Sequence, residues 1–94
     1  MIEQAEAQTS VKTADGAAKS TPGWVHWVAV SAGATGGAFQ LNDSTADAGT
    51  DKLDITMPAT STQFFRPFDP PIQFDIGIFV DIPGTNLTVT VGYS

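Results

Sequence analysis

The chain has 94 residues with 41% hydrophobic and 15% charged side chains, which suits one folded domain with a single modest core. Ten acidic against four basic residues give a net charge of −6, which argues against nucleic acid as a partner because its phosphates would be repelled. The chain has no cysteine and no apolar run long enough to cross a membrane, so we expect neither thiolate chemistry nor membrane association.

Residues 1–22 are rich in Ala, Gln, Thr and Ser and contain few large apolar side chains. Such a segment cannot bury enough apolar surface to form a core of its own, so we predict an extended, mobile arm. An edge strand at 10–13, followed by a turn at 14–16, is compatible with this composition, and a short helix over 3–8 is the alternative. The remaining residues, 23–94, form the predicted folded domain.

A strand is predicted from Gly23 to Ser31, because apolar residues alternate there on two faces. One face is expected to carry Trp24, His26, Val28 and Val30, and the other Val25, Trp27 and Ala29. A strand that is apolar on both faces is typical of a central position covered on both sides. His26 is the only histidine and has no nucleophile motif or adjacent acid, so we predict a structural role for it and no enzymatic activity.

The next predicted strands, through Phe39 and Leu41 and over 53–57, enclose a polar loop. Three carboxylates lie four residues apart in this loop: Asp43, Asp47 and Asp51. Carboxylates in a flexible loop are suitable ligands for calcium, although the spacing does not match an EF-hand. Aspartate is also common in turns, so we favour a solvated loop with no bound metal, and we expect no cofactor.

The segment around the single arginine is predicted to contain a subunit interface. Phe64 and Phe65 are adjacent on a strand predicted over 61–66, so they point to opposite faces and we expect one of them to be exposed. Exposed aromatic residues beside an arginine are typical of interfaces, although a two-sheet core would bury both rings without a partner. The predicted contact comprises Phe64, Phe65, Arg66 and Phe68. The prolines that follow lack amide donors, which predicts a sheet edge or a crossing between sheets: Pro67, Pro70 and Pro71.

The strongest period-two pattern runs from Ile72 to the end of the chain. Alternating apolar residues at 72–82 and 87–93, separated by turn residues at 83–86, predict one β-hairpin whose last strand belongs to the core. Together with the earlier segments this makes about six or seven short strands and no long helix. The predicted fold is therefore all-β, a two-sheet antiparallel sandwich with an extended N-terminal arm.

Several of these segments follow one another in a characteristic order. They are the strand at 23–31, a Gly-rich loop, Phe39-Gln40-Leu41-Asn42-Asp43-Ser44, Asp54-Ile55, and the run from Pro71 to Tyr93. The most specific piece is Phe-x-x-Gly-Ile-Phe-Val-Asp-Ile-Pro-Gly-Thr, which begins at Phe74. This order, from Gly23 to Ser94, resembles the small β-sandwich structural proteins of tailed bacteriophages, which include capsid decoration or cement proteins.

The resemblance implies a jelly-roll-like domain that assembles as a homotrimer on the outer capsid surface of the virion, after synthesis in the host cytoplasm. There it would bind the major capsid protein and stabilise contacts between neighbouring capsid subunits. A tail or head-fibre component of a phage is the alternative location. The resemblance does not extend to the N-terminal arm, and we predict that Ile2 and Val11 anchor this arm on the capsid.

A second class of function remains open on the residues alone. A β-sandwich with Trp24 or Trp27 exposed could stack one of these rings on a sugar, as a carbohydrate-binding module does. Exposed aromatic side chains in a shallow groove would favour sugar binding, whereas aromatic side chains held between subunits would favour the virion role.

Overall fold

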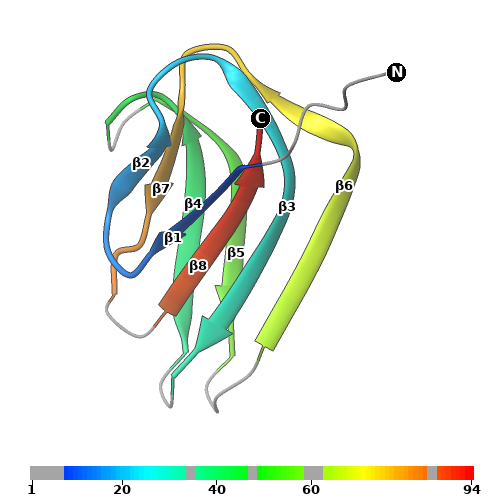
Figure 1. Ribbon diagram of the computed structural model, residues 1–94. Helices are drawn as coiled ribbons and strands as arrows, with labels where there is room; N and C mark the ends of the chain where they lie inside the picture. The colour runs from blue at the N-terminus through cyan, green and yellow to red at the C-terminus, as the bar shows by residue number, and fades with distance from the viewer. Residues whose placement is uncertain (1–7, 34–35, 47–48, 59–62, 85–86) are drawn as a thin grey trace.

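The computed structural model describes residues 8–33, 36–46, 49–58, 63–84 and 87–94. In these ranges all regular secondary structure is β, which confirms the all-β prediction (Figure 1). The eight strands are β1 (Gln8–Lys12), β2 (Gly16–Lys19), β3 (Gly23–Ala32), β4 (Gly37–Asp43), β5 (Thr50–Met57), β6 (Gln63–Phe74), β7 (Ile78–Asp81) and β8 (Leu87–Tyr93). Two residues to which the sequence assigns possible roles, Ile2 and Asp47, lie outside the described ranges.

The strands form two four-stranded antiparallel sheets that face each other across the core (Figure 1). Sheet A has the order β1-β8-β3-β6, and sheet B has the order β2-β7-β4-β5. Four pairs, β1 with β8, β2 with β7, β3 with β6 and β4 with β5, together describe one long hairpin that closes between β4 and β5. This hairpin is rolled up so that successive pairs alternate between the sheets, which is the topology of an eight-stranded jelly roll.

The predicted C-terminal hairpin is wrong, because β7 and β8 lie in different sheets. β7 pairs with β2 and β4 in sheet B, whereas β8 pairs with β1 and β3 in sheet A. The predicted strand at 72–82 is also divided, since Ile72 pairs with Val25 near the end of β6 and Ile78 begins β7. Both sheets bury their apolar residues against the same core, so the alternation continues across the change of sheet and does not reveal it.

The segment predicted as a mobile arm supplies one edge strand to each sheet. β1 lies beside β8, with Ser10 opposite Val91, and β2 lies beside β7. The predicted edge strand at 10–13 agrees with β1, but residues 8–19 belong to the sandwich and do not form a free arm. Their side chains contribute little apolar surface, and backbone pairing with β7 and β8 holds them instead.

The core lies between the sheets and is built from aliphatic and phenylalanine side chains. Those with less than 2% exposure are Phe39, Phe74, Leu41, Ile78, Val25, Val28, Val80, Val89 and Val91. Burial of each such side chain stabilises the fold by about 1.5 to 3 kcal/mol. Because these residues come from both sheets, each sheet keeps the core side chains of the other out of water.

A bulge in β3 decides which residues of this central strand face the core. The register of β3 shifts between Val25 and Trp27 against both β6 and β8. Val25, Val28 and Val30 therefore all face the core, whereas Trp24 and Trp27 face outward. The prediction of a central strand is confirmed, but the predicted faces are wrong before the bulge. The outward side is also open to solvent, since Trp24 is 43% exposed.

Candidate functional site

The outer face of sheet A is the side that points away from sheet B, and the strand pairings identify its residues. One row crosses all four strands: Val11 of β1, Thr90 of β8, Ala29 of β3 and Phe65 of β6. Alternation along each strand places further residues on the same side. They are Thr9, Trp24, Trp27, Ser31, Gln63, Pro67, Gln73, Thr88 and Gly92. None of these side chains is acidic or basic, although the chain carries a net charge of −6, and an ionisable group next to them is His26, which is bonded to Ser94.

Three large apolar side chains are exposed on the outer face of sheet A. Phe65 is 62% exposed, Val11 is 60% exposed and Trp24 is 43% exposed. Phe65 and Val11 lie on the two edge strands of the sheet, so the exposed apolar area extends across it. Single exposed apolar residues are ordinary on protein surfaces, but several on one uncharged face are typical of a binding surface.

Trp27 and Phe65 form an aromatic pair on this face. Their ring centroids lie 5.8 Å apart and the ring planes are inclined by 38°, a separation at which aromatic rings attract each other. Trp27 lies opposite Gly92 of β8 on one side and Pro67 of β6 on the other. A Cβ atom at position 92 would overlap the Trp27 indole, so the lack of a side chain at Gly92 leaves the space in which this ring lies.

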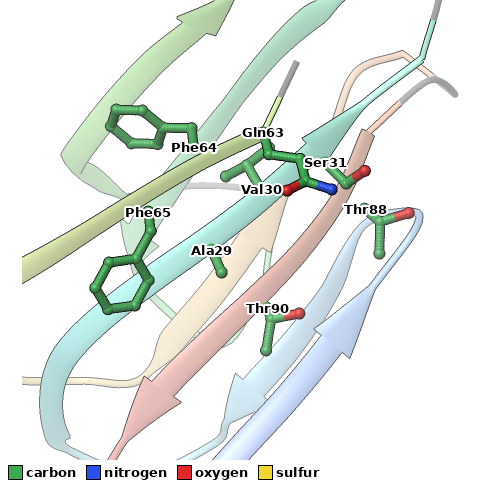
Figure 2. Close-up of a pocket in the computed structure, with 8 residues that line it drawn as sticks. All are labelled: Ala29, Val30, Ser31, Gln63, Phe64, Phe65, Thr88 and Thr90. Carbon is green, nitrogen blue, oxygen red and sulfur yellow. The ribbon is translucent and has the colours of Figure 1, made fainter. Parts of the chain in front are cut away.

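A shallow groove of about 340 Å³ lies beside Phe65. Its lining comprises Ala29, Val30, Ser31, Gln63, Phe64, Phe65, Thr88 and Thr90 (Figure 2). Figure 2 shows the rings of Phe64 and Phe65 on opposite sides of β6. Besides apolar surface, the lining offers three hydroxyl groups and one amide. All of these groups are neutral, so the groove suits an uncharged partner better than an ionic one.

The structure separates the four residues of the predicted subunit contact. Phe65 points outward, whereas Phe64 and Phe68 are partly buried and pack against the core. Arg66 is exposed, and its guanidinium carbon lies 5.8 Å from the centre of the Phe68 ring. The expectation that one of the adjacent phenylalanines is exposed is confirmed for Phe65. A contact role for these residues stays a prediction, and only Phe65 belongs to the outer face of sheet A.

The sequence gives only a partial signal for the outer face of sheet A. Thr88 and Thr90 alternate with buried residues of β8, which indicates a neutral outward side for that strand alone. The pairing of Trp27 with Phe65 depends on the bulge in β3 and on the register between β3 and β6. Val11, predicted to anchor a free arm, lies instead at the β1 edge of this face.

Asp43, one of the three calcium candidates, has a structural role at the end of β4. Its carboxylate accepts hydrogen bonds from the backbone N–H groups of Asp75 (3.1 Å), Ile76 (2.8 Å) and Gly77 (3.4 Å). Burial disfavours the charged form of Asp43, but these donors and the positive charge of Lys52 outweigh it and hold the pKa of the carboxyl below its ordinary value. Asp43 is therefore not part of a solvated loop, because it fixes the turn between β6 and β7.

Asp51, the second calcium candidate in the described part of the chain, is exposed in β5 and lies opposite Asn42. Among the residues that the structure describes, no three histidine, aspartate or glutamate side chains form a group that could hold a metal ion. The described ranges thus do not bring Asp43 and Asp51 together with a third acidic or histidine ligand.

His26 takes part in the contact between β3 and the residue that follows β8. Its Nε2 lies 2.8 Å from Oγ of Ser94, and the two atoms share a hydrogen bond. The backbone N–H of Trp24 donates to the carbonyl of Ser94 at 3.0 Å, and the N–H of Ser94 donates to the carbonyl of Trp24 at 2.9 Å. These bonds hold residue 94 against β3, a structural contact of the kind predicted for the histidine.

Comparisons of the chain with protein-family models, with curated proteins and with solved structures found no match in any of the three. Within the described ranges, no helix has the length and apolar character needed to cross a membrane. Function is accordingly inferred from the geometry of the outer face of sheet A and from the pattern of the sequence.

Proposed function

We propose that this protein is a virion structural protein of the capsid decoration type, which binds the outer capsid and stabilises contacts between major capsid proteins. The observation that carries the proposal is the outer face of sheet A, whose described outward residues expose apolar side chains and include no aspartate, glutamate, lysine or arginine in a chain of net charge −6. The resemblance of residues 23–94 to phage decoration proteins supports the same role. Eight-stranded jelly rolls occur in viral capsid and lectin domains, a fold-level analogy that is compatible with an attachment function.

An uncharged face is suited to protein contact because it avoids the largest cost of burying a surface. Charged groups lose strong hydration when they leave water, and the centres of interfaces are accordingly depleted in charge and enriched in aromatic residues. Phe65 and Trp27 provide aromatic surface, and Ser31, Thr88 and Thr90 provide neutral hydrogen-bonding groups beside it. Two chains of like net charge repel each other least when they meet through a face whose described outward residues carry no acidic group.

A homotrimer is the proposed assembled form, with Phe65 in the contact between subunits. Arg66 and Phe68 are close to Phe65 on β6, an edge strand of sheet A, so a contact at this edge has them at its rim. Phe64 faces the core and supports β6 from within. Val11, on the opposite edge strand β1, is the described residue proposed to touch the major capsid protein.

The mass of the protein in solution, measured by light scattering, tests this assembly. A trimer is expected for the intact chain, and Phe65→Ser should shift the mass toward the monomer while the circular dichroism stays that of a β-sheet protein. Ile76→Ser is the matched control, because Ile76 is similarly exposed (57%) but lies in the turn between β6 and β7. A monomeric wild type, or equal effects of the two substitutions, would contradict the proposal.

The groove beside Phe65 favours one alternative function, that of a carbohydrate-binding module. The exposed ring of Phe65 could stack on the apolar side of a sugar, while Ser31 and Gln63 offer hydrogen bonds to its hydroxyl groups. Titration with neutral oligosaccharides, followed by tryptophan fluorescence, tests this alternative. Saturable binding by a monomer that is lost in Phe65→Ser would favour the sugar, whereas a trimer with no response would favour the virion role.

A further inference from the structure

Gly92 allows the Trp27 ring to lie against the backbone of β8. The two residues are directly opposite each other in the pair of β3 and β8. A Cβ atom at position 92 would overlap Cε2 and Nε1 of the indole and would lie 2.7 Å from Cδ2. These distances are well inside van der Waals contact, so any larger residue at this position would displace the ring.

The Trp27 ring in turn forms a wall beside Phe65. Phe65 lies on β6, an edge strand whose partner among the described strands is β3, and its side chain is 62% exposed, so few neighbours restrict its rotamers. The indole, 5.8 Å away between ring centroids, is the aromatic neighbour that does so. A side chain that is already ordered loses less conformational entropy when a partner covers it, which strengthens binding.

We infer that Phe65 is the anchor of the binding face and that Gly92, acting through Trp27, sets the direction in which this anchor points. Trp27 and Gly92 are thus positioning residues. The inference rests on the proposed function, because it requires that a second copy of this chain covers the outer face of sheet A in the trimer. It adds that the neighbouring subunit accepts the Phe65 ring in one fixed direction. Gly92, beneath the indole, then decides whether this face can form the contact.

Gly92→Ala in the full chain tests the inference, and Gly84→Ala is the matched control. A Cβ atom at position 84 meets no atom within 4 Å, so the control makes the same chemical change without displacing a neighbour. We expect G92A to remove the nuclear Overhauser contacts between the Trp27 and Phe65 rings and to weaken trimer formation by about tenfold. G84A should leave both the ring contacts and the assembly unchanged.

A Phe65→Ala background separates positioning from a general loss of stability. If Gly92 acts through Phe65, G92A weakens assembly of the wild type but adds no further loss to F65A. Equal losses in both backgrounds, or unchanged ring contacts in G92A, would overturn the inference. Trp27→Leu provides a second variant in case G92A does not fold, and assembly of W27L as strong as that of the wild type would overturn it as well.

The ring contacts also distinguish failure of this inference from failure of the proposed function. A monomeric wild type whose Trp27 and Phe65 contacts disappear in G92A would support the positioning role of Gly92 and overturn the proposed assembly. A trimer of undiminished strength in G92A would overturn the positioning role and leave the assembly in place.

Discussion

The outer faces of the two sheets differ in charge, although both sheets have four strands and cover the same core. In sheet B, Asp54 lies opposite Gln40, whose neighbour on the other side is Asp81. Asp51, opposite Asn42, adds a third acidic residue to that face. In sheet A, the outward residues identified from the strand pairings include no aspartate, glutamate, lysine or arginine, and His26, bonded to Ser94, is an ionisable group beside them. The acidic side chains on the outer face of sheet B therefore have no counterpart among the outward residues named for sheet A, a distribution compatible with the proposed contact through sheet A.

The two sheets also differ in what prevents their edge strands from pairing with another chain. β5, at the edge of sheet B, exposes Asp51, Lys52 and Asp54, and charged side chains discourage pairing with another chain. β6, at the edge of sheet A, contains three prolines that lack the N–H group needed to extend the sheet: Pro67, Pro70 and Pro71. Proline prevents strand pairing at an edge without adding charge. This means of blocking the edge of sheet A is therefore compatible with the neutral side chains on its outer face.

Substitutions in the core should have the largest effect and should not distinguish the two sheets. Phe39 of sheet B and Phe74 of sheet A are both fully buried. Replacing either by alanine should lower the free energy of unfolding by about 3 to 5 kcal/mol, because each leaves a cavity in the same core. Urea unfolding followed by circular dichroism measures this loss. A much smaller loss for one of the two would show that the sheets do not share the core equally.

Replacement of Asp43 should have the next largest effect on the free energy of unfolding, because the carboxylate of this residue at the end of β4 holds the turn between β6 and β7. Asp43→Ala leaves three backbone N–H groups without their acceptor and should lower the free energy of unfolding by about 1 to 3 kcal/mol. Asp54→Ala removes an exposed carboxylate of the same sheet and should change stability by less than about 0.5 kcal/mol. Similar losses for the two would indicate that the hydrogen bonds of Asp43 contribute nothing to stability.

The contribution of Asp43 should also depend on pH. Its pKa in the folded protein lies below the ordinary value of 3.8, so the unfolded chain takes up a proton first as the pH falls. The stabilisation is fully present above that ordinary value and is lost as the pH falls through the folded pKa. The stability difference between wild type and D43A, measured by urea unfolding, should therefore be constant above about pH 5 and shrink below about pH 4. A difference that stays constant down to pH 2 would contradict this.

The smallest effects on stability, and the sharpest contrast between the faces, are expected for added charges. Thr90→Lys places a charge on the outer face of sheet A, and Thr56→Lys places one on the outer face of sheet B. Each should change the free energy of unfolding by less than about 0.5 kcal/mol. T90K should nevertheless reduce the proposed trimer, because a contact through the outer face of sheet A would bury an unpaired charge, whereas T56K should not. Equal trimer content in the two variants would refute the assignment of the contact to sheet A.

Alternation along the chain determines which side chains face the core. Leu87, Val89 and Val91 are buried as their spacing predicts, because successive side chains of an extended backbone point to opposite faces. The separation of Phe64 from Phe65 follows for the same reason, and the edge position of β6 follows from the missing amide groups of its prolines. These features depend on residues that are neighbours in the sequence, and so the sequence by itself determines them.

Sheet membership, the bulge in β3 and the neutral outer face are decided only in the tertiary structure. Alternation specifies a face but not a partner, so the run at 72–82 is periodic throughout although it passes from one sheet to the other. Residues 8–19 have little apolar surface and become strands because β7 and β8 offer backbone partners. Val11 and Phe65 share one uncharged row because the roll of the long hairpin brings β1, β8, β3 and β6 side by side, and contacts between such distant segments are not encoded in any local pattern.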